Sequence, residues 1–428
     1  MIVRERLRPH VFRLPVEKIR AGYKTDVYFN RTKLILEADN HRTGATMQVF
    51  HKIRGATVVG TDQTLAILHL GAGYYRDRER AQRLFERYLR LERDAYRLWL
   101  RIGRLRWEEY AAVGRDLFEV SQELDRLWVS TFLDLEVHSL YDGEVADELE
   151  TVMLIEGDYS TFAHLETVYL GALTDGTMVA TNTGAVVEAA NGKPVMMFGA
   201  RHQGHEQQAS SGYAAFIGGA KGVSTDEQAE WWGSKGIGTI PHALIAVYGG
   251  DTVLTTVKFA EYIDPSVSIT SLVDFDNDCV NTSLAVARAL GGRLWGVRLD
   301  TSENMVDRAI FEEIMARGEA ANTKVSGVTP ELVWAVRRGL DAAGFGHVKI
   351  IASSGFTAER IRHFEEQGVP VDVYGVGSAL FDGTGGKYDY TADVVRVNGV
   401  PLAKKGRRYR PNERLHRVDL MALAGTLV

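Results

Sequence analysis

The sequence predicts an α/β protein, an incomplete TIM-like α/β barrel with a second, α+β domain built from the N-terminal region and the C-terminal tail. Three observations predict this architecture. Residues 348–383 read as strand, helix and strand; strands and helices alternate after residue 154; and short strand patterns stand at both ends of the chain. We therefore expect an N-terminal domain over residues 1–150, a barrel over residues 151–384, and a tail, residues 385–428, that returns to the N-terminal domain.

Composition limits the class of protein. A chain of 428 residues with 45% hydrophobic and 25% charged residues has enough apolar material for two or three domains, or for one barrel with additions. The net charge of -6 argues against a nucleic-acid-binding protein. The single cysteine, Cys279, excludes an intramolecular disulfide and a cysteine-rich zinc site, and it suits a reducing cytoplasm. Without an 18-residue apolar run, neither secretion nor a membrane span is expected.

The first part of the chain carries short strand patterns. Residues 25–40, 45–52 and 56–60 have alternating or continuous apolar character, which predicts strands of a sheet separate from the barrel. Asp26 and Tyr28 stand at the start of the first of these patterns, where we expect turn residues.

Residues 74–128 change to long helices, because Leu, Phe, Tyr and Trp recur at spacings of three and four. Residues 76–109 contain eleven Arg against seven acidic residues, which would suit a surface for nucleic acid or another anion. Since the acidic residues are interleaved with the Arg, we favour a solvated face with pairs at i,i+4 spacing.

Strands and helices alternate through the rest of the barrel region. The sequence predicts a helix from residue 281 that ends at Gly291 and Gly292, and another from Pro330 to Gly344. In the tail, Asn398-Gly399 indicates a hairpin turn. Strands are expected at residues 195–198, 238–242, 272–274 and 297–300, and in the tail at residues 390–397 and 400–403.

Residues 348–383 give the main sequence evidence for function. Its first strand, residues 348–352, runs into Ser353-Ser354-Gly355, and its second, residues 371–374, runs into Gly375-Val376-Gly377-Ser378. Thr357 is placed to cap the intervening helix and Gly368 to end it. Both loops then lie at one edge of a parallel sheet, where backbone N–H groups and a helix N-terminus can hold a phosphate. The alternative is that such turns favour Gly and Ser in any protein.

Charged residues follow other predicted strands. Asp274 and Asp300 each end an apolar run, and their oxygens suit Mg2+ or sugar hydroxyls, or else they cap helices and support loops. Arg201 and Arg298 suit a phosphate, a pyrophosphate or a carboxylate, or else they form structural ion pairs. His242 follows Pro241 at a predicted strand end and is a candidate nucleophile or hydrogen-bonding imidazole.

Other chemistries are disfavoured. The histidines of HQGHE, residues 202–206, are three apart, but they lack the HExxH spacing and a third placed ligand, so no zinc site is expected. No GxSxG elbow and no GxxxxGK[ST] loop occurs, which argues against a serine hydrolase and a P-loop NTPase.

The order of motifs resembles the nicotinate phosphoribosyltransferase family, within the type II phosphoribosyltransferases that also include the nicotinamide and quinolinate enzymes. The resemblance covers roughly residues 25–60 and 150–405. The matching segments are TDVYF from Thr25, VEAANGKPVMMFGARH from Val187, GTIPHAL from Gly238, LVDFDND from Leu272, GVRLD from Gly296, IASSGF from Ile351 and VPVDVYGVGSALFDG from Val369.

This resemblance implies roles for single residues. His242 corresponds to the histidine that ATP phosphorylates in the family, and Asp274 and Asp300 to the acids around the ribose and Mg2+, with Asp300 as the metal ligand. Phe198 resembles the aromatic residue that stacks on the pyridine ring. The other nicotinate-binding residues implied are Asp26, Tyr28, Arg201, Ser224 and Arg298, and the phosphate-binding residues are Ser353, Ser354, Gly355, Gly375, Val376, Gly377 and Ser378.

Two further expectations follow from the resemblance. Tyr28 resembles a tyrosine that closes the base site from a neighbouring subunit, so a homodimer or higher homo-oligomer is expected. Ser224 stands where the nicotinamide enzymes carry an aspartate, which favours a carboxylate substrate because no anion repels it.

The chain also departs from the family. Its single cysteine rules out the cysteine-rich metal knuckle of some members, the helices of residues 74–128 match no motif, and Ser353-Ser354-Gly355 replaces an acidic residue or a second Gly that relatives often carry.

The expected function is an ATP-assisted transfer of a phosphoribosyl group from phosphoribosyl pyrophosphate to nicotinate in NAD biosynthesis, with Mg2+, in the cytoplasm. One alternative is a related enzyme that uses nicotinamide or quinolinate. A second, from outside this class, is a non-catalytic barrel that binds a phosphorylated metabolite while the Arg-rich helices bind a protein or RNA partner.

Overall fold

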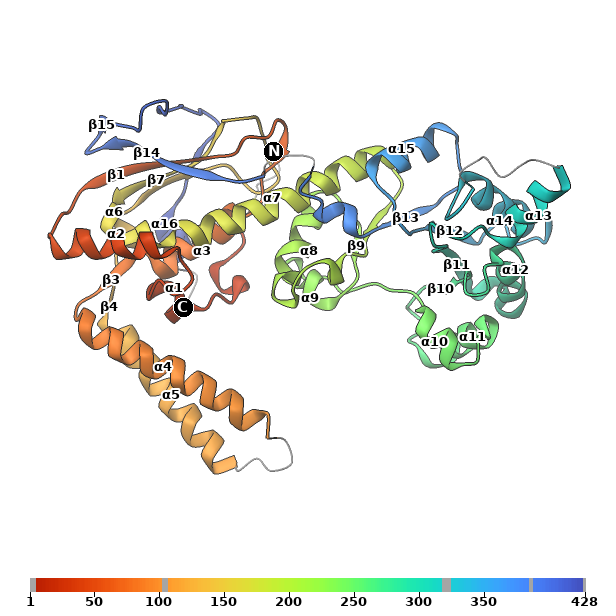
Figure 1. The fold of residues 1–428 in the computed structure, drawn as a ribbon, viewed down its shortest axis with the longest axis horizontal. Coiled ribbons are helices and arrows are strands. Elements are labelled where there is room, and N and C mark those ends of the chain that lie inside the picture. Colours follow the sequence, from red (N-terminus) through yellow and green to blue (C-terminus); the bar gives the residue numbers. More distant parts are fainter. Residues whose placement is uncertain (1–4, 102–106, 318–324, 385–387, 426–428) are drawn as a thin grey trace. The chain divides into compact units, whose positions relative to one another are not determined.

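The computed structural model describes residues 5–101, 107–317, 325–384 and 388–425. The chain forms two compact units (Figure 1). The first, which we call the N-terminal unit, comprises Met1–Thr177 with Gly386–Val428, and the second, the barrel unit, comprises Met178–Gly385. Helix α7 (Glu166–Ala189) crosses the boundary between them in the sequence.

The barrel unit contains a six-stranded sheet in which every neighbouring pair is parallel, in the order β10-β11-β12-β13-β8-β9. Because the last strand along the chain, β13, pairs with the first, β8, the sheet returns on itself as a barrel does. Within the described residues, β9 and β10 do not pair, so the barrel is incomplete, as the sequence predicts. The strands are β8 (Val195–Met197), β9 (Gly222–Val223), β10 (Ile269–Leu272), β11 (Leu294–Leu299), β12 (Lys349–Ala352) and β13 (Val373–Val376).

Helices connect these strands and end where local chemistry predicts. Thr357 caps α15 by accepting a hydrogen bond from the Arg360 N–H (3.2 Å), and Asp278 caps α12 in the same way through Asn281. The helices of this unit after α7 are α8 (Gln208–Ile217), α9 (Asp226–Ala229), α10 (His242–Val247), α11 (Thr252–Tyr262), α12 (Cys279–Leu290), α13 (Arg308–Arg317), α14 (Pro330–Ala342) and α15 (Ala358–Glu366).

The N-terminal unit is built on an antiparallel sheet in the order β15-β14-β1-β7-β5-β16. The tail supplies β14, which pairs with β1, and turns into β15 at Asn398-Gly399, where both residues have positive φ. One face of the sheet packs on helix α3 through a core that includes Met47, Leu68 and Ile155. The strands of this unit are β1 (Gly44–Phe50), β2 (Ala56–Thr57), β3 (Gly73–Tyr75), β4 (Trp128–Ser130), β5 (Glu136–Ser139), β6 (Val145–Ala146), β7 (Thr151–Asp158), β14 (Thr391–Val397), β15 (Val400–Pro401) and β16 (His416–Arg417).

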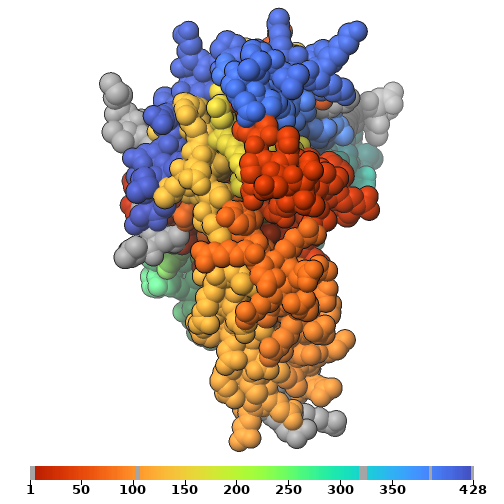
Figure 2. All heavy atoms as spheres, turned by 90° about the vertical axis from the view of Figure 1, so that its left-hand side faces the viewer, coloured from red at the N-terminus to blue at the C-terminus, as the bar shows by residue number. Residues whose placement is uncertain are grey.

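Helices α4 (Arg78–Trp99) and α5 (Trp107–Leu127) form a hairpin that projects from the N-terminal unit (Figures 1 and 2). A small core of Ala81, Val120 and Leu124 joins them, and their base is fixed by the pairing of β3 with β4. Ion pairs such as Arg80–Glu123 (2.6 Å) and Arg87–Asp116 (3.7 Å) run between the helices. The helices of the unit are α1 (Val16–Arg20), α2 (Val27–Ala38), α3 (Thr61–Gly71), α4 (Arg78–Trp99), α5 (Trp107–Leu127), α6 (Tyr159–Phe162) and α16 (Leu420–Ala424).

The strand prediction for residues 25–40 is wrong, because Val27–Ala38 is helix α2. Asp26 occupies its N-cap position and Tyr28 its first turn, so neither is a turn residue before a strand. The inward face of α2 carries polar residues: Asn30 donates to the Gly22 carbonyl (2.7 Å) and Lys33 to the Gly73 carbonyl (2.6 Å). Apolar periodicity therefore could not reveal this helix.

The strand predicted at residues 238–242 is also wrong. Residues 235–241 have no regular structure, and His242 begins helix α10. Pro241 has no N–H to donate to a strand ladder. No helix among the described residues combines the length and the apolar character needed to cross a membrane.

Candidate active site

The carboxyl ends of the parallel strands bring together most of the residues singled out in the barrel sequence. Phe198 follows β8, Ser224 follows β9 and Asp300 follows β11 directly, while Asp274 lies two residues beyond β10. Ser353 follows β12. In parallel α/β sheets this edge is where ligands bind, because the loops and helix N-termini open there.

His242 and Asp274 form a pair. The Nε2 atom of His242 lies 3.0 Å from Oδ2 of Asp274. The histidine side chain is 44% exposed and the aspartate side chain only 6%. Burial raises the pKa of Asp274, and the nearby Asp300 adds to this rise, whereas His242 opposes it. The second carboxylate oxygen, Oδ1, is buried without a hydrogen-bond partner among the described residues.

A second set of contacts centres on Arg298, inside β11. Its Nη2 atom lies 3.0 Å from Oδ1 of Asp300, and its Nε donates to the Ser353 hydroxyl (2.8 Å). That hydroxyl donates in turn to Asp300 (2.7 Å). The guanidinium also donates through Nη1 to the hydroxyl of Thr239 (3.2 Å), three residues before His242. Arg298 thus ties β11 and β12 to the irregular segment that carries the histidine.

The Phe198 ring lies under this guanidinium, with Cζ of Arg298 4.9 Å from the ring centre. Gly375 makes room for the ring: a Cβ atom there would lie 2.5 Å from a Phe198 ring carbon. The backbone N–H of Phe198 donates to the Val376 carbonyl (2.7 Å). The aromatic residue and the glycine-bearing strand are therefore in direct contact.

The boundary predicted for the second phosphate loop needs correction. Gly375 and Val376 lie inside β13, because they pair with Met196 and Met197 of β8. Only Gly377 and Ser378 follow the strand, and Ser378 opens a short 3-10 helix, Ser378–Phe381.

The first loop has an unusual backbone. Ser354 (φ 76°) and Gly355 (φ 66°) both occupy the left-handed region, which a residue other than Gly seldom adopts. Arg360 braces the loop by donating to the Ser354 carbonyl (2.8 Å). A strained conformation of this kind, held by its surroundings, is typical of functional loops.

Two other predicted site residues, Ser224 and Arg201, and the histidine His202 have different surroundings. Ser224 donates its hydroxyl to Oε1 of Gln228 (3.1 Å), a fully buried side chain. Arg201 is exposed and has no ion-pair partner in the described part of the chain. His202, in the HQGHE segment, stacks on Phe381 with 6.1 Å between ring centres.

Asp26 and Tyr28 belong to the N-terminal unit. The Thr167 hydroxyl donates to Oδ2 of Asp26 (2.8 Å), and the same carboxylate accepts from the Tyr28 hydroxyl (3.4 Å). Tyr28 is 58% exposed and packs on Phe29. These contacts leave most of the Tyr28 ring available.

The acids are suited to a magnesium ion that retains other ligands. Among the described residues, no group of three or more His, Cys, Asp or Glu is arranged to hold a metal by itself. Mg2+ commonly takes one or two carboxylates and fills its remaining positions with water and substrate phosphates. The unpartnered Oδ1 of Asp274 and the neighbouring Asp300 match that requirement.

Thr239 and Gln228 were not singled out in the sequence, yet each fixes a predicted site residue. Thr239 stands within GTIPHAL, close enough to His242 to have drawn attention. Gln228 gives no comparable signal, because only the helix capped by Thr225 brings it back to Ser224.

Comparison with known proteins finds curated relatives named nicotinate phosphoribosyltransferase. The chain is 27% identical over 296 residues to nicotinate phosphoribosyltransferase pncB1 of Mycobacterium tuberculosis, which covers 67% of this chain and 60% of that protein. It is 27% identical over 247 residues to nicotinate phosphoribosyltransferase of Bacillus subtilis, covering 57% of this chain and 45% of that one. This similarity supports a place for the chain in the nicotinate phosphoribosyltransferase family.

Solved structures extend this similarity to the fold. Nicotinate-nucleotide pyrophosphorylase from Pyrococcus furiosus shares 29% identity with a TM-score of 0.67, over 94% of this chain and 84% of that one. Human nicotinic acid phosphoribosyltransferase, at 18% identity and a TM-score of 0.55 over 88% of this chain and 75% of that one, shows the same fold. No protein-family model matches the sequence. The chain spans 45% to 60% of the length of the two curated relatives.

Proposed function

We propose that this protein transfers the phosphoribosyl group of phosphoribosyl pyrophosphate to nicotinate, giving nicotinate mononucleotide and pyrophosphate, with ATP hydrolysis as an aid. The observation that carries the proposal is the presence of two sets of contacts at the carboxyl edge of the barrel: His242 to Asp274, and Arg298 to Asp300, Ser353 and Phe198. The names of the relatives support the same reaction class.

The reaction requires positioning and charge stabilisation rather than covalent catalysis at the sugar. The bond from C1 of the ribose to pyrophosphate breaks, and the ring nitrogen of nicotinate forms the new bond to C1. Phe198, which lies against Gly375 and has the Arg298 guanidinium over one face, offers a flat surface for the pyridine ring. Arg201, a cation without a partner among the described residues, suits the ring carboxylate or a phosphate oxygen.

Asp274 and Asp300 would hold Mg2+ together with the phosphate oxygens of the substrate, and the ion would supply charge neutralisation for the departing pyrophosphate. The backbone N–H groups after β12 and β13 would hold the 5'-phosphate, since they open at the same edge. Within the protein, Arg298 keeps Asp300 oriented and limits its freedom to rotate.

The His242–Asp274 pair supports phosphorylation of the histidine. With the proton on Nε2 donated to Asp274, the lone pair of Nδ1 is available to attack the γ-phosphorus of ATP, and ADP leaves. Exposure of His242 gives the nucleotide access. The phosphoryl group would add negative charge beside the pyrophosphate site until water removes it.

The test is an assay of the purified protein with phosphoribosyl pyrophosphate and nicotinate, nicotinamide or quinolinate, with and without ATP. We expect pyrophosphate release with nicotinate, and stimulation by ATP. A parallel incubation with γ-labelled ATP should give an acid-labile phosphoryl group that His242→Ala abolishes, while His205→Ala retains it. Label that persists in His242→Ala would overturn the histidine assignment.

The preference for one pyridine base distinguishes nicotinate transfer from the closest alternative, transfer to nicotinamide or quinolinate. Ser224, whose hydroxyl donates to the neutral amide of Gln228, places no anion at this position, so a carboxylate is not repelled. We expect Ser224→Asp to lower the rate with nicotinate relative to nicotinamide. A faster wild-type reaction with nicotinamide or quinolinate would contradict the substrate assignment but retain the reaction class. A non-catalytic barrel with an RNA or protein partner predicts no pyrophosphate release with any base.

A further inference from the structure

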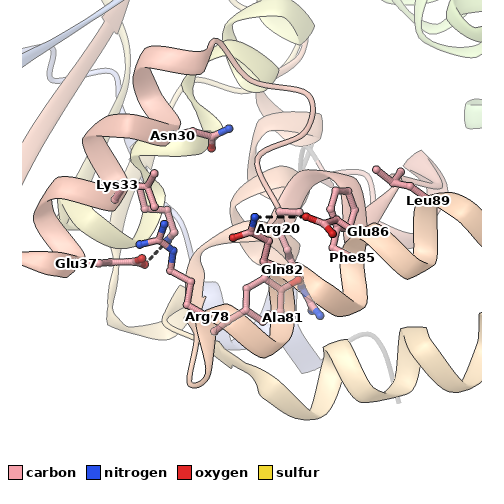
Figure 3. Close-up of a pocket in the computed structure, with 13 residues that line it drawn as sticks. Arg20, Asn30, Lys33, Glu37, Arg78, Ala81, Gln82, Phe85, Glu86 and Leu89 are labelled. Carbon is pink, nitrogen blue, oxygen red and sulfur yellow. Dashed lines mark hydrogen bonds and ion pairs between the residues drawn. The ribbon is translucent and has the colours of Figure 1, made fainter.

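A cavity of about 390 Å³ lies within the N-terminal unit, between helix α2 and the base of helix α4 (Figure 3). This is within the volume range of pockets that bind small molecules, about 300 to 1,000 Å³. The proposed phosphoribosyl transfer uses none of its residues. The helical hairpin that forms one wall also matches no motif of the family.

One end of the pocket is lined by polar groups, and the other by both apolar and polar groups. Figure 3 shows the polar groups of Lys33, Glu37 and Arg78 gathered on one side, and Phe85 and Leu89 on the other, beside Glu86. Side chains of this kind suit an amphiphilic ligand, because the apolar body and the polar group can be recognised separately.

The charges at the polar end do not cancel. Lys33 is paired with Glu37 (3.3 Å) and donates to the carbonyl groups of Gly73 (2.6 Å) and Ser160 (3.1 Å). Burial lowers the pKa of Lys33 to about 8. Arg78 is exposed and has no hydrogen-bond or ion-pair partner in the described part of the chain.

The other charged groups of the lining have partners. Arg20 pairs with Asp125 (2.7 Å), and Glu86 accepts a hydrogen bond from Gln82 (3.4 Å). Since the other two cations each have a carboxylate partner, Arg78 is the cation left to attract an anion. Tyr75, which also lines the pocket, has a buried hydroxyl without a partner among the described residues.

We propose that this pocket binds a small monoanionic molecule with an aromatic or alkyl body, and that Arg78 recognises its carboxylate or sulfonate group. The apolar body contacts Phe85 and Leu89, and the anionic group lies at the Arg78 end. One anion matches the one uncompensated cation, whereas a second negative charge would face Glu37 and Glu86.

The experiment compares two fluorescent probes of similar shape on the full chain. Anilinonaphthalene sulfonate carries one negative charge, and N-phenylnaphthylamine carries none. Arg78→Gln removes the proposed anion contact at an exposed position, and Arg83→Gln, five residues further along α4 and outside the pocket lining, is the matched control. Gln82→Trp places a bulky side chain at the pocket from an exposed position, and thermal unfolding checks that each variant is folded.

We expect Arg78→Gln to weaken binding of the anionic probe by about tenfold, the size of one hydrogen bond to a charged group. The neutral probe should bind Arg78→Gln as it binds wild type, Arg83→Gln should bind both probes normally, and Gln82→Trp should weaken both. Equal affinity of wild type and Arg78→Gln for the anionic probe, or equal losses in Arg78→Gln and Arg83→Gln, would overturn the anion contact. Unchanged binding of both probes to Gln82→Trp would place them outside this pocket.

Discussion

Replacement of Gly375 by Ala tests whether the glycine-bearing strand and the aromatic ring act as one unit. The added Cβ atom would lie 2.5 and 2.6 Å from two ring carbons of Phe198 and 3.2 Å from Cβ of Ser353. Carbon atoms in contact sit about 3.5 to 4.0 Å apart, so the ring must move by roughly 1 Å. The strand cannot yield instead without losing its pairing with β8.

The cost follows from this overlap. Overpacking of a filled site costs about 1–3 kcal/mol. If the ring moves aside without strain but the base needs it in its original position, this cost appears in nicotinate binding, as a rise in KM of about five- to 150-fold. If the folded state carries the strain, the free energy of unfolding falls by the same amount. The sum of the two effects is the quantity that the structure predicts.

The assay combines steady-state kinetics, with nicotinate varied at saturating phosphoribosyl pyrophosphate, with urea unfolding. Gly292→Ala is the control, because a Cβ atom there meets nothing within 4 Å. Unchanged KM and unchanged stability of Gly375→Ala would refute the reasoning. An equal loss in Gly292→Ala would show that the effect belongs to glycine replacement in general.

Three further predictions concern polar groups that are wholly or partly buried. Burial raises the pKa of Asp274, so the folded state holds this proton more tightly than the unfolded state, and stability is lost as the pH rises above the unfolded pKa of about 4. Asp274→Asn should therefore be at least as stable as wild type at pH 7 by urea unfolding, while pyrophosphate release falls. Glu166, whose pKa burial raises to about 8, should make wild type lose stability between about pH 4.5 and 8, and Glu166→Gln should flatten this slope in the same measurement. Thr239→Val removes the hydroxyl that accepts a hydrogen bond from Arg298. Loss of one such bond, about 1 kcal/mol of transition-state stabilisation, predicts a roughly fivefold fall in kcat/KM for nicotinate.

Each of these has a clear contrary result. An Asp274→Asn variant that is less stable than wild type at pH 7 would show that the bond to His242 outweighs the burial of the carboxylate. Parallel stability curves for wild type and Glu166→Gln would place the titration on another group. Normal kinetics in Thr239→Val, with Thr239→Ser as the conservative comparison, would mean that Asp300 and Ser353 suffice to hold Arg298.

Elements with strong local signals could be predicted from the sequence by itself. Thr357 supplies a side-chain cap, Pro330 begins α14, and Asn398-Gly399 adopts the positive φ values that a tight hairpin needs. The alternation of apolar strands with capped helices determined the parallel sheet for the same reason. These features depend on residues close together in the chain, so their physical causes are visible without a structure.

Tertiary structure decided what depends on distant partners. Helix α2 turns polar side chains inward, where Lys33 reaches carbonyl groups 40 and 127 residues away, and no periodicity rule can detect such contacts. The segment before His242 became irregular because Arg298 and Pro241 determine its path. The chemical groups at the strand ends could be identified from the sequence. The pairing of His242 with Asp274 and the contact of Phe198 with Gly375 form only when the barrel strands lie next to one another.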